Sequence, residues 1–306
     1  MRDSLFFKQA DLLVQVLPFV HAESDFALKG GTAINFFVRD FPRLSVDIDL
    51  VYLPVEDRPT SLRGIDAALQ RIASKIRRAM PGAQVREQKL PGDNRLIKLT
   101  VRAASGAEVK IEPNTVLRGC LFPTNERTLT AKAVEVFGRS ATMRVVALPD
   151  LYGGKLCAAL DRQHPRDLFD VHGLFQNEGL TDDVRRAFVV YLASHDRPIL
   201  ELLCPHRKDL KQVYADQFAG MTLAPVALSV LEETREQLIA RLNSDLTLAE
   251  REFLLSLKRL EPKWDLLGLP GVERLPGPQW KLYNLRKMDP AKRQVAEVKL
   301  RRQLGL

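Results

Sequence analysis

Apolar and polar positions follow two different patterns along the chain, and the change falls near Pro149. Before it, stretches rich in Val, Ile and Leu predict strands at 25–28, 46–53, 95–103, 107–113 and 143–148. Ser105-Gly106 separates two of these strands and predicts a hairpin. Apolar residues at helical spacing predict helices at 1–18, directly after Gly30-Gly31, and at 61–80.

After Pro149 the spacing is helical almost throughout. Helices are predicted at 150–163, 166–176, 181–194, after Pro225, and at 247–260. The last of these opens with a capping box, Thr247 with Glu250. We therefore expect an α/β (α+β) domain with a mixed sheet at 1–147. A helical domain with a basic C-terminal helix should follow at 148–306.

The composition is that of an ordinary globular protein, with 45% hydrophobic and 27% charged residues among 306. Its apolar runs are shorter than the roughly 20 residues that span a bilayer. The N-terminal stretch carries Asp3 and Asp11 and lacks a small-residue cleavage site, so it does not resemble a signal peptide. We expect a cytoplasmic protein that does not contact a membrane. Cys120, Cys157 and Cys204 form no CxxC pair and are predicted to be small core residues.

The formal net charge of +8 favours a polyanionic partner. Basic residues concentrate in the last segment: Lys281, Arg286, Lys287, Lys292, Arg293, Lys299, Arg301 and Arg302. This pattern is equally typical of a solvated helix face and of an RNA contact, and the sequence does not separate the two.

Two carboxylates stand out in the segment RLSVDIDL. Asp47 and Asp49 are two apart on a predicted strand, so both side chains point to the same face. Two carboxylates on one face repel each other unless they are exposed or bind a cation. Mg²⁺ commonly joins one or two protein carboxylates to substrate phosphates. The alternative is a pair of exposed acids on an edge strand.

A glycine turn precedes this strand. Gly30, Gly31 and Thr32 lie between a predicted strand and a helix, where glycine lets the backbone approach phosphate. The segment lacks a P-loop pattern, and a tight turn without a ligand is the alternative. A glycine turn followed by a DxD strand is the arrangement of DNA-polymerase-β-like nucleotidyltransferases, whose third carboxylate comes from a neighbouring strand. Here Glu112 is favoured over Glu108, because Glu112 lies nearer the end of its strand.

A third group of charged residues lies in the helical half. Lys155, Arg162, Arg166, Asp167 and Asp170 recur at helical spacings, apart from a break near Pro165. They could converge on one polar cluster, in which a lysine or arginine binds phosphate. The alternative is a salt-bridge ladder within one helix, such as Arg166 with Asp170.

Three segments, GGTAINFF, RLSVDIDL and KLCAALDRQHPRDLFDVHGL, resemble the AbiEii/AbiGii (MenT-like) nucleotidyltransferase toxins of bacterial toxin–antitoxin systems. The resemblance runs over roughly residues 28–175. It implies that Gly30, Gly31 and Thr32 line the triphosphate site. It places Ser45, Asp47 and Asp49 at the metal centre, Lys155 at the nucleotide phosphates, and Asp170 near the attacking hydroxyl. Arg166 is a further candidate for nucleotide binding, because arginine is a good bidentate phosphate ligand.

We therefore expect transfer of an NMP unit from an NTP to an acceptor hydroxyl. Asp47 and Asp49 would bind Mg²⁺ with Glu112 as third ligand, and Asp170 or Asp47 would take the acceptor proton. The resemblance implies RNA as acceptor, in the form of the tRNA 3′ end, and a separately encoded antitoxin as partner. The alternatives are nucleotidylation of a protein or small molecule, and a non-catalytic RNA-binding module. The active site is expected at the seam between the two domains.

Overall fold

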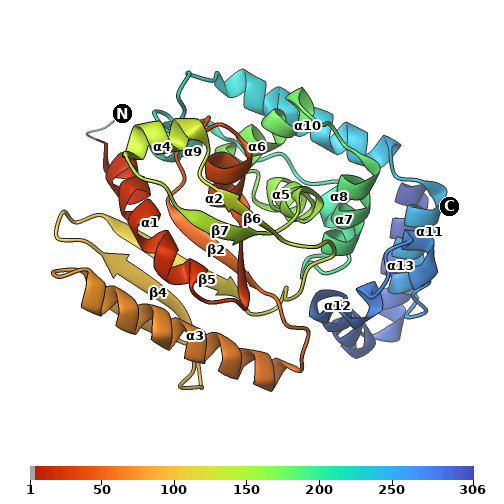
Figure 1. Cartoon of the computed structure of the whole chain (residues 1–306). Helices are drawn as coiled ribbons and strands as arrows, with labels where there is room; N and C mark the ends of the chain where they lie inside the picture. The colour runs from red at the N-terminus through yellow and green to blue at the C-terminus, as the bar shows by residue number, and fades with distance from the viewer. Residues whose placement is uncertain (1–3) are drawn as a thin grey trace. The chain divides into compact units, whose positions relative to one another are not determined.

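The computed structural model describes residues 4–306, which form two compact units. The first comprises the described residues up to Ala147 together with Ala219–Pro225, and the second comprises Leu148–Phe218 and Val226–Leu306 (Figure 1). The short segment Ala219–Pro225 thus belongs with the first unit, although its position in the sequence lies inside the helical half.

The first unit is built on one mixed seven-stranded sheet. Its strands are β1 Phe26–Lys29, β2 Asp47–Tyr52, β3 Gln84–Lys89, β4 Leu96–Arg102, β5 Glu108–Asn114, β6 Asn125–Thr128 and β7 Thr142–Val145. They follow the order β3-β4-β5-β2-β1-β7-β6. The pairs β2–β5 and β1–β7 are parallel and the others antiparallel, which confirms the predicted α/β class with a mixed sheet.

Helices complete this unit. They are α1 Leu5–His21, α2 Gly30–Thr32, the π-helical turn η1 Ala33–Val38, α3 Arg58–Ala79 and α4 Ala131–Phe137. Figure 1 shows α1 and α3 side by side on one face of the sheet, where α3 contacts β4 and α1 contacts β5. The prediction that the first helix ends at Pro18 is wrong, because α1 continues to His21. Fully buried Leu17 and Val20 hold its last turn against the core despite the proline. The predicted start of this helix, including Asp3, lies outside the described residues.

Residues 42–44 lie in the connection between η1 and β2. They pair with Ala219–Pro225, which we call the returning segment because it comes back to the first unit from the helical half. The Leu44 N–H donates to Met221 O over 2.7 Å, and the Leu223 N–H donates to Pro42 O over 3.0 Å. Met221 is completely buried. The returning segment therefore supports the backbone just before Ser45 and the acidic strand.

The second unit is helical. Its elements are α5 Leu148–Arg162, α6 Pro165–Gln176, α7 Asp182–Leu192, α8 Ile199–Leu203, α9 Lys211–Gln217, α10 Leu228–Ser244, α11 Leu248–Lys258, η2 Trp264–Leu267, η3 Val272–Arg274, α12 Pro276–Lys287 and α13 Pro290–Leu304. Pro165 starts α6, as expected of a residue without an N–H at the first helical position. The basic C-terminal segment forms two helices, α12 and α13, because Pro290 begins a second one.

The three cysteines have different environments. Cys157 is buried, Cys120 is half-buried and Cys204 is exposed, so the predicted core role is wrong for Cys204. Among the helices of residues 4–306, none combines the length and the apolar character that crossing a bilayer requires.

Candidate active site

Asp47 and Asp49 lie on one face of β2, as strand alternation requires. Both are half-buried, whereas Ile48 and Leu50 on the opposite face are completely buried. The core therefore fixes the strand, and the two carboxylates emerge together on the other side of the sheet.

A row of charged residues crosses four neighbouring strands at Asp49. Asp49 is in register with Glu112 on β5 and with Lys29 on β1. Glu112 forms an ion pair with Lys98 on β4. Two neighbouring carboxylates are thus flanked by a lysine on each side, which offsets their mutual repulsion.

The alternative third acid, Glu108, lies outside this row. It is in register with Arg102, and its carboxylate lies 3.8 Å from Arg102 Nε and 3.9 Å from Arg86 Nη1. Of the two glutamates on β5, only Glu112 stands beside Asp49.

The carboxylates Asp47 and Asp49 supply hard oxygen donors on one face, which suits Mg²⁺ completed by water and phosphate oxygens. Within residues 4–306, no group of three or more His, Cys, Asp or Glu side chains is arranged to hold a metal ion. Glu112 is engaged by Lys98. The donor set therefore fits an ion held by two protein carboxylates, and a third ligand from Glu112 would have to leave Lys98.

The glycine turn packs directly against the acidic strand. Gly30 has φ +72°, and a Cβ added there would collide with the Asp49 carboxylate. A Cβ added at Gly31 would lie 2.7 Å from Arg43 Nη2 and 3.1 Å from Ser45 Oγ. Glycine is therefore required at Gly30 by conformation and at both positions by space.

Buried polar groups connect this turn to β2. Thr32 Oγ1 donates to Asp47 O over 2.6 Å and lies 2.9 Å from Ser45 Oγ. Asn35 Nδ2 donates to Gly31 O over 2.8 Å from the π-helical turn. These hydrogen bonds fix the turn, both hydroxyls and the start of the acidic strand as one rigid group.

Arg43 also belongs to this site, and sequence reasoning missed it. Only 2% of the residue is exposed, and its Nη1 donates to Leu44 O over 2.8 Å. Its second terminal nitrogen, Nη2, lies next to Gly31. Arg43 lies two residues before Ser45, and this closeness in sequence could have indicated a role in the site. An arginine in a connecting segment is, however, normally expected to be exposed to solvent. The structure places this positive charge beside the glycine turn.

In the second unit, charged residues form a buried cluster between α5 and α6. Lys155 Nζ lies 2.7 Å from Asp167 Oδ1 and 3.0 Å from Asp170 Oδ2, and all three side chains are at most 6% exposed. Arg162 Nη2 donates to Asp167 Oδ1 over 2.9 Å. These ion pairs join two helices. Arg166 is half-buried on α6.

The Asp167 carboxylate of this cluster is ionised at neutral pH. Burial by itself raises the pKa of Asp167, but the opposing charges and hydrogen bonds of Lys155 and Arg162 outweigh it, so the pKa lies well below its ordinary value. His164 next to the cluster caps α6: its Nδ1 accepts from Arg166 N over 3.1 Å, and Nε2 lies 3.1 Å from Gln217 Oε1. Burial lowers the pKa of His164, which fits a neutral capping residue.

The sequence-predicted residues thus gather in two groups. Gly30, Gly31, Thr32, Ser45, Asp47, Asp49 and Glu112 lie together in the first unit. Lys155 and Asp170 contact each other in the second unit, with Arg166 on the same helix as Asp170.

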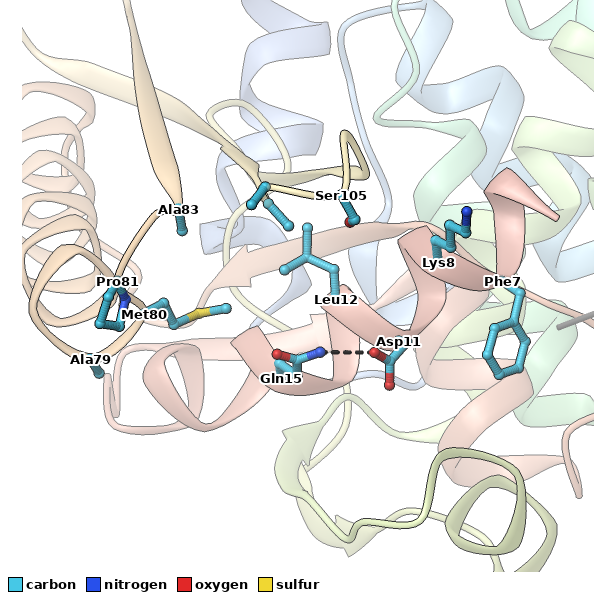
Figure 2. Close-up of a pocket in the computed structure, with 12 residues that line it drawn as sticks. Phe7, Lys8, Asp11, Leu12, Gln15, Ala79, Met80, Pro81, Ala83 and Ser105 are labelled. Carbon is cyan, nitrogen blue, oxygen red and sulfur yellow. Dashed lines mark hydrogen bonds between the residues drawn. The ribbon is translucent and has the colours of Figure 1, made fainter. Parts of the chain in front are cut away.

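A cavity of about 500 Å³ lies elsewhere in the first unit, between α1, the end of α3 and the β4–β5 turn (Figure 2). Its walls include Leu12, Met80 and Ser105, and Gln15 donates to Asp11 over 2.8 Å at its edge. It contains none of the predicted site residues, so the site is not in this cavity.

Comparison with known proteins identifies the fold and family. Residues 11–268 match the family model of the nucleotidyl transferase AbiEii toxin of type IV toxin–antitoxin systems, which confirms the resemblance inferred from the three sequence segments. The fold is similar to that of the solved structure of MenT4, a nucleotidyltransferase toxin from Mycobacterium tuberculosis H37Rv. The identity is 18% and the TM-score 0.63, over 92% of this chain and 94% of that one. No curated protein matches the chain.

Proposed function

The chain belongs to the AbiEii family of nucleotidyltransferase toxins of type IV toxin–antitoxin systems, and on that premise we propose the chemistry of its site. It transfers an NMP unit from an NTP to an acceptor hydroxyl and releases pyrophosphate. Asp47 and Asp49 bind Mg²⁺, which supplies charge neutralisation at the reacting phosphate when bound. The observation that carries this assignment is the packing of the Asp49 carboxylate directly against the Gly30 turn.

The groups around this contact suit a triphosphate. Gly30 and Gly31 let the turn pack closely against Asp49, Arg43 and Ser45, and Thr32 and Ser45 add hydroxyls. Arg43 adds a fixed positive charge beside Gly31. A prearranged set of donors of this kind stabilises developing negative charge without reorganising during the reaction.

Asp170 is poorly suited to take the acceptor proton. Asp170 is completely buried and its carboxylate lies 3.0 Å from Lys155 Nζ, and an adjacent ammonium makes a carboxylate a weaker base. We assign Asp170 the role of holding Lys155 in place. We propose Lys155 and Arg166 as the phosphate-binding residues of the second unit, as the family resemblance implies for Lys155.

An RNA acceptor is supported by an exposed surface on α12. Trp280 and Tyr283 stack with ring centroids 5.5 Å apart, and both are more than 40% exposed. Lys287 Nζ lies 4.1 Å from the Tyr283 ring centre. Exposed aromatic rings beside cations are suited to unstacked bases and phosphates. We propose RNA, with the tRNA 3′ end as its reactive hydroxyl, in the cytoplasm.

The test is incubation of the protein with each labelled NTP, Mg²⁺ and fractionated cellular RNA. We expect label in the tRNA fraction with at least one NTP, and none after chelation of the metal. Asp49→Asn should lower labelling by at least about 1000-fold, as loss of charge stabilisation at a reacting centre does. Glu126→Gln, which changes an exposed carboxylate on β6, should leave labelling unchanged.

Three outcomes would contradict parts of this proposal. Equal labelling by Asp49→Asn would remove the carboxylate from the chemistry. Label in protein or in a small molecule, with none in RNA, would remove the RNA acceptor. Unchanged labelling by Trp280→Ala with Tyr283→Ala would remove the aromatic surface from RNA binding. The family also implies an antitoxin, which should restore growth when it is expressed with the toxin.

A further inference from the structure

The second unit contains a cavity that nucleotidyl transfer does not explain. It has a volume of about 300 Å³ and is enclosed by α8, α11, α12 and α13. Its walls are largely aliphatic, with Leu200, Leu285 and Leu300 from three of these helices. Three lysines also line it. Lys299 on α13 is exposed, whereas Lys258, the last residue of α11, and Lys281 in the middle of α12 are buried. The volume is sufficient for a small ligand.

Both lysines are buried, with 8% of Lys258 and 7% of Lys281 exposed. Lys281 Nζ donates to the carbonyl oxygens of His195 and Arg197, each over 2.6 Å. Among residues 4–306, the acceptor found for Lys258 Nζ is the Met288 thioether, 3.9 Å away. An ammonium has three donors and a thioether is a weak acceptor, so Lys258 lacks the partners that a buried cation needs.

No carboxylate of the described residues forms a direct ion pair with Lys258 or Lys281, although Asp196 and Glu201 act on Lys281 from a distance. Within the described part of the chain, no Asp or Glu oxygen lies within 4.0 Å of either lysine nitrogen. The two acids at the rim have other neighbours: Asp196 lies 3.0 Å from His195 Nδ1 and Glu201 lies 4.0 Å from Arg197 Nη1. Both acids are largely exposed, so the interior of the cavity is positively charged.

Lys281 is affected by the charge of Lys258. Burial and then the charge of Lys258 lower the pKa of Lys281 to about 8, and Asp196 and Glu201 oppose this shift only in part. Burial also lowers the pKa of Lys258, followed by the charge of Arg293. Such neighbouring cations are strained without a counter-ion, and an anion placed between them would relieve both.

We propose that this cavity binds a small organic carboxylate with an apolar body, held by the Lys258 and Lys281 ammonium groups. The apolar body lies against Leu200, Leu285 and Leu300. The aliphatic walls disfavour a fully hydrated inorganic anion, and the volume is too small for a macromolecule. This site is separate in residues and chemistry from the carboxylates Asp47 and Asp49.

The experiment uses a fluorescent anion, 8-anilinonaphthalene-1-sulfonate, and its uncharged counterpart, N-phenyl-1-naphthylamine, with the full-length protein. We expect the anion to bind at one site per chain and at least about tenfold more tightly than the uncharged compound, since a charged contact in a buried site exceeds 1.4 kcal/mol. Octanoate should displace the bound anion, whereas octanol and inorganic phosphate at the same concentrations should not.

Substitution of single lysines tests which residues bind the anion. Lys258→Met and Lys281→Met should each weaken anion binding at least about tenfold. Lys263→Met, which alters an exposed lysine between α11 and η2, should bind as the wild type does. Lys258→Met is the decisive variant, because replacing a buried cation that lacks a carboxylate partner should preserve or raise the melting temperature. It therefore reports on binding and not on folding.

The proposal is overturned if Lys258→Met is folded and binds the anion as tightly as the wild type. Equal affinity for the uncharged compound would show an apolar site without charge recognition. Displacement by phosphate as effective as displacement by octanoate would show an inorganic anion site. Each of these results rejects an organic carboxylate as the ligand, and none depends on nucleotidyltransferase activity.

Discussion

At the scale of single residues, the candidate active site depends on close contacts between the glycine turn and the acidic strand. Gly30 and Gly31 are in contact with Asp49, Arg43 and Ser45, and Thr32 donates to the backbone of Asp47. A small displacement at the turn is therefore transmitted directly to the carboxylates. Misplacement of a reacting group by about 1 Å can cost on the order of 100-fold in rate.

The prediction at this scale concerns Gly31→Ala. The new methyl group would lie 2.7 Å from Arg43 Nη2, so the turn or the guanidinium must move. We expect kcat/KM for NTP to fall by about 100-fold while the protein stays folded. Steady-state kinetics and circular dichroism measure both effects. Gly173→Ala on α6, where an added Cβ meets nothing within 4 Å, is the control and should keep full activity. An equally active Gly31→Ala protein would show that this turn does not approach the substrate.

At the scale of secondary-structure elements, the ion pairs of Lys155 join α5 to α6. Asp167 accepts from both Lys155 and Arg162, and it is 1% exposed. Removal of one partner from a buried pair leaves the other charge uncompensated, which is much more costly than loss of an exposed pair. The cluster thus has a structural role in addition to the proposed catalytic role of Lys155.

We predict that Asp167→Asn lowers the free energy of unfolding by about 1–3 kcal/mol, because Lys155 keeps its ion pair with Asp170 and Arg162 is 60% exposed. Asp182→Asn, whose side chain is 82% exposed and pairs with Arg185, should change it by less than about 1 kcal/mol. Chemical denaturation measured at pH 7 compares the two variants. Similar stabilities for both would mean that the buried cluster contributes no more than a surface pair.

The same carboxylate predicts a sensitivity to acid. The pKa of folded Asp167 lies below its ordinary value, so the unfolded state takes up the proton first as the pH falls. The contribution of Asp167 to stability is complete above the unfolded pKa and is lost progressively below it. The stability difference between wild type and Asp167→Asn should therefore shrink from pH 6 towards pH 3. A difference that stays constant over this range would contradict the assigned ionisation.

The elements with a strong hydrophobic pattern were predictable, and the exposed ones were not. Strand β2 and helix α3 follow from regular apolar spacing because one face of each is buried. Strand β6 has four exposed residues, and β3 is exposed at five of its six positions, so neither shows the alternation that marks a strand. Both lie at the edges of the sheet, where pairing with one neighbour determines the structure.

The site was predictable to a similar extent. Asp47, Asp49 and the glycine turn have local signatures, and the match of Glu112 to Asp49 follows once β5 is placed beside β2. The burial of Arg43 and the pairing of Leu44 with Met221 depend on tertiary contacts far apart in sequence. No local pattern contains that information.

At the scale of the whole molecule, the net charge of +8 is not all at the surface. Lys281 and Lys258 contribute to this positive charge, but both are buried in the second unit. A buried lysine with a lowered pKa opposes folding while it is charged. The protein should therefore become more stable as this charge is lost.

The prediction follows from the pKa of about 8 for Lys281, against 10.5 for an exposed lysine. Between these values the unfolded state binds more protons, so the free energy of unfolding rises with pH, by at most roughly 3 kcal/mol from this group. The neutral amine still has two N–H donors for the carbonyls of His195 and Arg197, so deprotonation costs no hydrogen bond. Relative to Lys281→Met, the wild type should gain stability from pH 8 to 10.5 in denaturation measurements. If the free energy of unfolding changed with pH in the same way for wild type and Lys281→Met, the prediction would be contradicted.

The returning segment Ala219–Pro225 determines how the protein can be divided. A gene fragment that ends at Ala147 would encode the whole sheet but omit the backbone that pairs with residues 42–44. The fragment would thus lose the support of the residues that lead into Ser45 and Asp47. Expression of the first unit by itself, or nicking by a protease between 218 and 226, should therefore damage the carboxylate site without removing any residue of that site.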